Sequence, residues 1–152
     1  MRVFSENRKA RHDYFIEEKY ECGIVLHGTE VKSIRAGRVN LKESYCIIRD
    51  SQIYILGMHI SPYEQGSIFN VDPLRERVLL MHKREIRKLD SDSSQKGYSI
   101  VPLRIYANDN GKVKMEIALV KGKHNYDKRQ AIADKDAKRT IEREISKSLK
   151  YS

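Results

Sequence analysis

The hydrophobic and polar positions of the chain alternate in short runs, which is typical of strands rather than of long helices. The clearest alternation runs from Lys112 to Leu119, where apolar residues at every second position face one side and charged residues face the other. An apolar run at residues 98–106 precedes it, and the Asn-Gly step in the loop 107–111 favours a tight turn. These features predict an antiparallel hairpin over residues 98–119.

Earlier runs rich in β-branched and aromatic residues predict further strands. Two of them are joined at Asp50-Ser51 and read as a second hairpin, in which Ile47, Ile53 and Ile55 are among the residues expected to face inward. The predicted strands in this part of the chain are 14–26, 39–49, 52–59 and 78–81.

Two short stretches have helical periodicity. Thr29 is a suitable cap for the first, residues 30–36, in which Val31 and Ile34 face inward while Lys32 and Arg35 point outward. The second covers residues 82–89, and a polar loop at 90–96 follows it. Six or so antiparallel strands with short helices at an open end predict a mainly β fold, a closed or nearly closed barrel rather than a helical bundle.

The net charge of the chain indicates which kinds of partner it can bind. The 152 residues carry a formal charge of +9, and a pI near 9.5 indicates nucleic acid, acidic lipid or an acidic protein as the partner. The chain has no run of about twenty apolar residues, and its first residues lack the apolar stretch of a signal peptide, so we expect a cytoplasmic protein that does not enter a membrane. Cys22 and Cys46 have no metal-ligand spacing and read as two buried free thiols.

Both ends of the chain are basic. Residues 1–13 predict a basic N-terminal arm that stays loose unless something binds it. Residues 121–152 hold ten of the 30 Lys and Arg but five of the 21 Asp and Glu, with a thin apolar seam at Ala137, Ile141, Ile145 and Leu149. The cationic run 121–129 contains one tyrosine and suits phosphates and exposed bases, which predicts a tail that faces RNA; the alternative is a solvated helix without a partner.

Catalytic signals are weak. The five histidines are scattered, no nucleotide-binding glycine loop occurs, and the residues predict neither a metal site nor a cofactor. A ribonuclease that uses two histidines and a lysine stays open but unsupported. The remaining signal is a set of cations that either form one positive side of the barrel or are simply solvated: Lys32, Arg35, Arg38, Arg75, Arg77, Lys83, Arg84, Lys112 and Lys114.

Longer strings of residues indicate which protein family the chain resembles. These are NRKARHDYFIEE at 7–18, GTEVKSIRAG at 28–37, GMHISPY at 57–63, DPLR at 72–75 followed by Arg77, KGK at 121–123 and YDKR at 126–129. In this order, and from residue 7 to about residue 143, the chain closely resembles the bacterial SmpB family of SsrA-binding proteins.

The resemblance implies an oligonucleotide-binding-type (OB) antiparallel barrel with flanking helices that is not an enzyme. Such proteins bind the tRNA-like domain of transfer-messenger RNA (tmRNA, or SsrA RNA). With that RNA, elongation factor Tu and the small ribosomal subunit, they rescue stalled ribosomes by trans-translation. The resemblance implies three parts in this chain: a basic arm at 1–13, an RNA-binding barrel at 14–123 and a C-terminal tail at 124–152. We expect a monomer, and the alternative is a general OB-fold binder of structured or ribosomal RNA.

The resemblance also implies the site residues. The RNA-binding positions would be Glu21, Leu80 and Lys112, supported by Arg11, His12, Lys32, Arg35, Lys114 and Lys123. A carboxylate cannot hold a phosphate, so Glu21 would accept from base or sugar donors or hold a neighbouring arginine. Leu80 would either touch RNA or be a barrel residue whose loss distorts the site.

Family tails are disordered when free and fold into a helix in the empty message channel. Tyr126 would then stack near the decoding bases, while Asp127, Lys128 and Arg129 make polar contacts. Two departures stand out: the polar segment 90–94, where we expect a shorter or mobile helix end, and the pair His124-Asn125, where more basic or apolar residues are frequent in the family.

Overall fold

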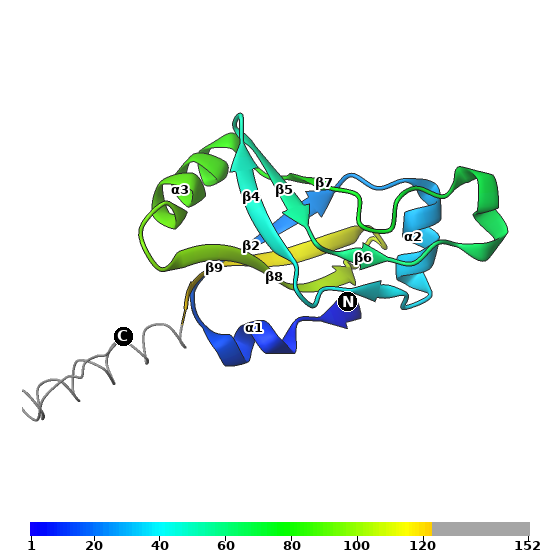
Figure 1. The fold of residues 1–152 in the computed structure, drawn as a ribbon, viewed down its shortest axis with the longest axis horizontal. Coiled ribbons are helices and arrows are strands. Elements are labelled where there is room, and N and C mark those ends of the chain that lie inside the picture. The colour runs from blue at the N-terminus through cyan, green and yellow to red at the C-terminus, as the bar shows by residue number, and fades with distance from the viewer. Residues whose placement is uncertain (123–152) are drawn as a thin grey trace, which may run out of the picture. The chain divides into compact units, whose positions relative to one another are not determined.

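A computed structural model describes residues 1–122, and residues 123–152 lie outside the described part (Figure 1). The strands are β1 (Arg2–Glu6), β2 (Tyr14–Ile24), β3 (Val39–Asn40), β4 (Tyr45–Arg49), β5 (Gln52–Leu56), β6 (His59–Ile60), β7 (Arg77–Leu80), β8 (Tyr98–Ala107) and β9 (Val113–Gly122). The helices are α1 (Arg8–Asp13), α2 (Gly28–Arg35), α3 (Lys83–Ser93) and a 3-10 helix at Glu64–Phe69. None of the helices in residues 1–122 is both long enough and apolar enough to span a membrane.

Six strands close into a ring, in the order β8-β4-β5-β7-β2-β9 and back to β8. The long strand β8 pairs with β9 along its length, and its other edge is shared by β4, at Ile100, and by β1, at residues 104–107. Closure leaves few free strand edges. Small antiparallel folds commonly close in this way, because an exposed strand edge can pair with another chain. The structure thus confirms the predicted mainly β barrel with short flanking helices.

The β4–β5 hairpin shows how side-chain alternation fills the barrel. Asp50 and Ser51 both have positive φ, +53° and +65°, which suits a two-residue turn between twisted strands. Cys46 pairs with Ile55 and Ile48 with Ile53, and these four residues belong to the core cluster or pack against it. Ile53 and Ile55 are buried as predicted, but Ile47 has the opposite parity, so the prediction that it faces inward is wrong.

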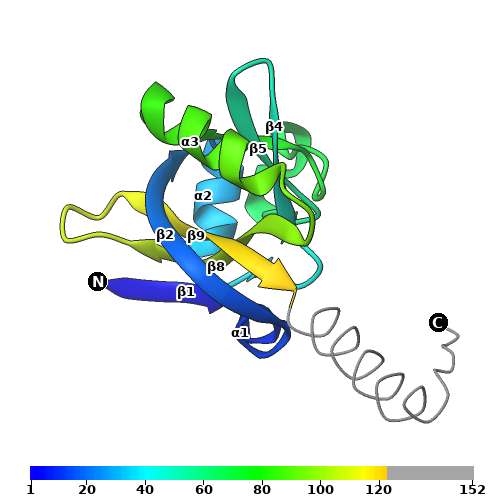
Figure 2. The same ribbon diagram turned by 90° about the vertical axis from the view of Figure 1, so that its left-hand side faces the viewer.

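The helices close the barrel and cover part of its outside. Ile34 of α2 and Leu89 of α3 are fully buried in the main core. Outside the barrel, Ala10 of α1 packs against Val101 and Leu103 of β8, so α1 covers the outer face of β8 and β9. Figures 1 and 2 place α1 and α3 on opposite sides of the barrel.

The N-terminal residues are not a loose arm. Residues 2–6 form β1, which pairs with the C-terminal half of β8, and residues 8–13 form α1. Asn7 fixes the junction, because its backbone N–H donates to the Leu103 carbonyl at 2.8 Å and its side-chain amide donates to the Pro102 carbonyl at 3.0 Å. The expectation of a loose segment was wrong since the partners of these residues lie about 100 positions further along the chain.

Several predicted boundaries also differ, among them that of the strand predicted at 52–59, which is split into β5 and β6. α3 continues through residues 90–93, because Lys88 bridges Glu18 and Asp92 at 2.6 and 3.0 Å, and these bonds hold the polar turn in the helix. α2 begins at Gly28, before the predicted cap, and Glu30 accepts a hydrogen bond from the His27 N–H. The single strand expected at 39–49 is broken into β3 and β4 by a turn at which Glu43 has φ +67°.

The turn before β4 depends on Gly57. Its φ is +77°, and a Cβ at this position would lie 2.7 Å from the Glu43 carbonyl oxygen. We expect Gly57→Ala to lower the free energy of unfolding by about 1–3 kcal/mol, measured by urea denaturation. Gly28→Ala is the control, since that position has open space around it, and should leave stability unchanged or slightly raised. Equal stability of the two variants would contradict this account of the turn.

Candidate nucleic-acid interface

A shallow pocket of about 400 Å³ lies where β2, β7 and β9 meet the start of α3. Figure 2 shows β2, β9 and α3 near one another, and β7 pairs with β2. Glu21, Gly23, Leu80, His82, Glu85 and Lys114 are among the residues that line it. The structure therefore brings together three of the residues predicted to bind RNA, namely Glu21, Leu80 and Lys114.

Leu80 points out of the barrel. Leu80 is 57% exposed, so it is accessible from solvent although it belongs to the barrel strand β7. It pairs across the ladder with Gly23, where a Cβ would lie 3.4 Å from the Leu80 Cβ and 3.8 Å from the Lys114 Nζ. The glycine lets an apolar side chain and a cation approach each other in one concavity, an arrangement that suits a base or ribose with its phosphate.

Glu21 is held by a tyrosine rather than by an arginine. The exposed Glu21 carboxylate accepts a hydrogen bond from the Tyr106 hydroxyl, and Tyr106 is the cross-strand partner of Lys114. Burial raises the pKa of Tyr106, and the hydrogen bond and negative charge of Glu21 raise it further. The phenol therefore keeps its proton at neutral pH and fixes the carboxylate at the pocket edge.

A second group of predicted residues lies at the end of α2. The Arg35 guanidinium donates to the Gly111 carbonyl, which joins α2 to the β8–β9 turn beside the exposed Lys112. The Lys32 ammonium lies 5.4 Å from the centre of the Tyr63 ring. Lys32, Arg35 and Lys112 thus form a cationic ridge separate from the pocket of Glu21.

The other predicted positions are spread along the chain. Arg11 and His12 are exposed on α1, which lies away from α3 and its pocket, and the His12 ring contacts the Asp13 carboxylate at 2.9 Å. Lys123 lies outside the described residues, as do the four predicted tail residues Tyr126, Asp127, Lys128 and Arg129.

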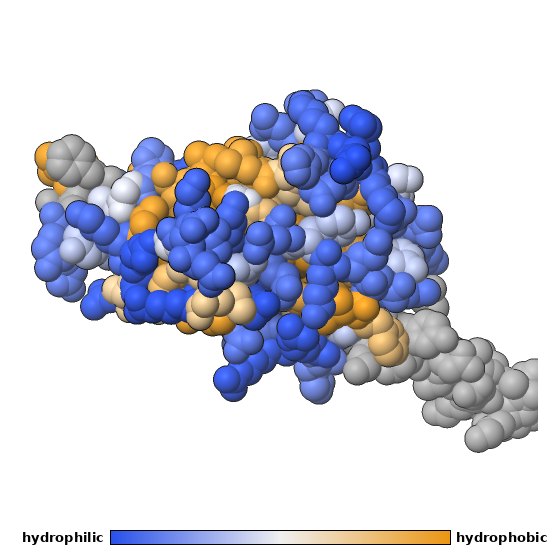
Figure 3. Space-filling view, turned by 180° about the vertical axis from the view of Figure 1, so that it is seen from behind, coloured by the Kyte–Doolittle hydropathy of each residue, from blue (hydrophilic) through white to orange (hydrophobic). Residues whose placement is uncertain are grey.

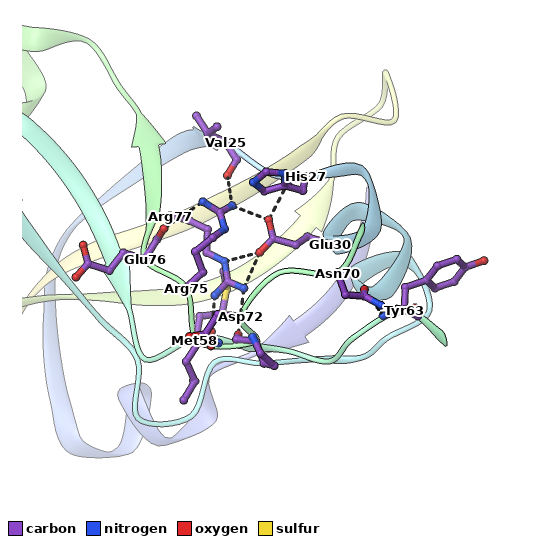
Figure 4. Close-up of polar contacts among 12 residues, drawn as sticks. Val25, His27, Glu30, Met58, Tyr63, Asn70, Asp72, Arg75, Glu76 and Arg77 are labelled. Carbon is purple, nitrogen blue, oxygen red and sulfur yellow. Dashed lines mark hydrogen bonds and ion pairs between the residues drawn. The ribbon is translucent and has the colours of Figure 1, made fainter. Parts of the chain in front are cut away.

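Two arginines that the sequence places on a positive surface have a structural role instead. Arg77 is fully buried, and its Nη2 lies 2.7 Å from the Glu30 carboxylate, while its Nη1 donates to the Met58 carbonyl at 2.7 Å (Figure 4). Arg75 approaches the same carboxylate at 2.6 Å and is 28% exposed. These ion pairs connect α2, β7 and the segment before it, so Arg77 does not contribute to a surface.

The charges of this network depend on each other. Burial raises the pKa of the Glu30 carboxyl, but hydrogen bonds from Arg75, from the His27 N–H and from Arg77 outweigh it and hold that pKa below its usual value. Burial lowers the pKa of Arg77, and the Glu30 carboxylate partly restores it. Glu30 is therefore a carboxylate at neutral pH that pairs with two guanidinium groups.

Apolar side chains reach the surface beside the pocket. Figure 3, seen from behind, shows an apolar area at the upper edge of the molecule, bordered by hydrophilic side chains. Among the residues 1–122, Val25 and Leu80 are large apolar side chains with about half of their surface exposed. An exposed apolar rim next to a cation is a common way to hold an unstacked base.

The sequence missed Tyr106, His82 and Gly23 as parts of the site. Only the position of Tyr106 opposite Lys114 in the predicted hairpin could have indicated the first of them. The two cysteines are buried free thiols, as predicted, and burial raises the pKa of Cys22 to about 12. Among residues 1–122, no group of three His, Cys, Asp or Glu side chains lies close enough to hold a metal ion.

Comparisons with known proteins agree with the strings of residues found in the sequence. A family model described as SmpB protein matches residues 4–147. The SsrA-binding protein of Clostridium tetani is 57% identical over 150 residues, covering 99% of this chain and 96% of the relative, and that of Acetivibrio thermocellus is 58% identical over 149 residues, covering 98% and 96%. A solved structure called "tmRNA-SmpB: a journey to the center of the bacterial ribosome" contains a chain that is 48% identical, with a TM-score of 0.71, over 94% of this chain and 96% of the other.

Proposed function

Because the chain belongs to the SmpB protein family, we propose that it binds the tRNA-like domain of tmRNA and delivers this RNA to stalled ribosomes for trans-translation. The observation that carries the proposal is the pocket of Glu21, Leu80 and Lys114, in which a carboxylate, an apolar surface and a cation converge. The names of the relatives and of the solved complex support the RNA and the ribosome as partners.

Each pocket residue has a distinct task in this proposal. Lys114 binds a backbone phosphate, and Leu80 packs against the apolar face of a base or ribose. Glu21, oriented by the Tyr106 hydroxyl, accepts from a base amino group or a ribose 2′-hydroxyl and excludes phosphate from its own position. The pocket thus favours one placement of the RNA over other placements on the basic surface.

The outlying cations give affinity rather than placement. The cationic ridge of Lys32, Arg35 and Lys112 provides phosphate contacts. Further supporting contacts come from Arg11, His12 and Lys123. The formal charge of +9 accelerates the encounter with RNA, and salt weakens this attraction.

The tail completes the ribosomal role. In this proposal Tyr126, Asp127, Lys128 and Arg129 occupy the decoding centre, and the residues up to Leu149 fold into a helix in the empty message channel. Elongation factor Tu is a further partner of the delivery complex. The protein acts in the cytoplasm as a monomer, without a cofactor and without catalysis of its own.

Lys114→Gln tests the pocket. We expect the affinity for the tRNA-like domain to fall about tenfold near physiological salt. The magnitude of the slope of the logarithm of the association constant against the logarithm of the salt concentration should fall by about one, because one counterion fewer is released. Filter binding or fluorescence anisotropy at several salt concentrations measures both quantities. Lys96→Gln, an exposed lysine after α3, is the matched control and should change the affinity less than twofold.

Leu80→Ala complements the charge variant. Because the side chain is exposed, the free energy of unfolding should change by less than about 1 kcal/mol while RNA affinity falls. If Leu80→Ala and Lys114→Gln weakened the binding of the tRNA-like domain and of plain duplex RNA equally, the protein would be a general OB-fold binder of structured RNA.

A further inference from the structure

A second pocket, of about 420 Å³, lies between α1, the residues before β4 and the start of β8. It shares no lining residue with the pocket beside α3. Residues of these elements and the first residues of β2 and β4 line it, among them Lys9, Asp13, Tyr14, Glu43, Tyr45 and Ser99. We propose that this pocket binds an unstacked guanine base of an RNA chain.

The pocket is built on a rigid floor. The Asn7 side chain accepts from the Ala10 N–H at 3.2 Å and donates to the Pro102 carbonyl, so it ties the start of α1 to β8. Ala10 is 2% exposed and packs against Val101, which also lines the pocket. One wall is therefore held in place before any ligand arrives.

The opposite wall has a strained backbone. Glu43 adopts φ +67°, which costs a residue with a side chain about 1 kcal/mol or more, and Gly57 is needed to accommodate its carbonyl. This conformation places the Glu43 carboxylate at the mouth, where it pairs with the Lys9 ammonium at 3.0 Å. Both side chains of this pair are more than half exposed, so a ligand can reach the carboxylate.

The chemistry of the lining selects a base rather than a phosphate. Asp13 and Glu43 repel phosphate, and both carboxylates accept hydrogen bonds. Guanine places two donors, N1–H and the N2 amino group, side by side, whereas adenine and uracil each place an acceptor beside a donor on that edge. Tyr45 is 47% exposed, and its ring offers a face on which the base can stack.

Exposed cations on the elements that form the pocket can bind the RNA backbone on either side of the base. Arg8 and Arg11 are exposed on α1, and Lys42 is exposed next to Glu43. A base inside and phosphates outside match this distribution of charge. The proposal does not depend on which RNA the α3 pocket recognises.

The test uses three labelled single-stranded hexamers, UUGUUU, UUAUUU and UUUUUU, with the full-length protein near physiological salt. Fluorescence anisotropy should show that UUGUUU binds about tenfold more tightly than the other two. Tyr45→Ala and Glu43→Gln should each reduce this preference to less than about twofold, and Tyr45→Phe, which keeps the ring, should retain it. Urea denaturation checks that the variants fold.

Matched controls come from the same hairpin and from a similar ion pair. Tyr54→Ala removes another outward tyrosine of this hairpin, and Glu76→Gln removes a carboxylate that pairs with Arg49 at 2.8 Å; neither should change the preference. Leu80→Ala should leave it intact, which separates this pocket from the proposed tmRNA site.

Three results would overturn the proposal. The first is equal binding of the three hexamers by the unaltered protein, and the second is a guanine preference that survives both Tyr45→Ala and Glu43→Gln. The third is Tyr45-dependent binding of a short arginine-containing peptide without binding of the hexamers, which would assign the pocket to a protein partner.

Discussion

Glu30→Gln should lower the free energy of unfolding by about 3–5 kcal/mol, the largest effect expected of a single substitution in the barrel. The glutamine has nearly the same shape but leaves the buried Arg77 guanidinium without its counter-charge, and Arg75 loses its partner at 2.6 Å. Urea denaturation at neutral pH measures the change. Glu76→Gln, which breaks an exposed pair with Arg49, should cost less than about 1 kcal/mol.

The same carboxylate makes stability depend on pH. The pKa of Glu30 is held below its unfolded value of about 4.3, so its contribution is complete above that value and is lost as the pH falls through the lower folded pKa. The Glu30→Gln variant should therefore show a flatter acid limb in a plot of stability against pH. Parallel acid limbs for the variant and the parent chain would contradict the role assigned to Glu30.

The combined replacement of Asp127, Lys128 and Arg129 by alanine should abolish ribosome rescue while leaving tmRNA binding within about threefold of the unaltered protein. The reason is a division of labour, because the α3 pocket lies within residues 1–122 and the three replaced residues lie outside them. A reconstituted assay of peptide tagging on stalled ribosomes, run beside RNA binding, measures both effects. A triple variant that still tags stalled chains would refute the proposed task of the tail.

Features determined by neighbours in sequence could be predicted best. The β4–β5 and β8–β9 hairpins follow from alternation and turn residues that lie within a few positions of each other. Ile47 was misplaced because a strand that is apolar on both faces gives no parity signal. The β1 strand could not be predicted from local pattern, because its partner on β8 is about 100 residues away.

The candidate site likewise contains residues that could be predicted from the sequence and residues that could not. The resemblance gave Glu21, Leu80 and Lys114, and the fold brings them together. It could not give the Tyr106 hydroxyl that holds Glu21, since the two residues are 85 positions apart. Nor does a charge pattern distinguish Arg77, which neutralises Glu30 in the interior, from an arginine that faces RNA. Burial decides this difference, and burial is a property of the fold.

The measurement that tests the central claim most directly is the binding of the full chain to the tRNA-like domain of tmRNA, compared with plain duplex and single-stranded RNA of equal length at one near-physiological salt concentration. We predict that the tRNA-like domain binds at least about a hundredfold more tightly than either competitor, and that Lys114→Gln and Leu80→Ala reduce this ratio. Equal affinity for all three RNAs would contradict the account and leave a basic barrel that binds RNA without selecting it.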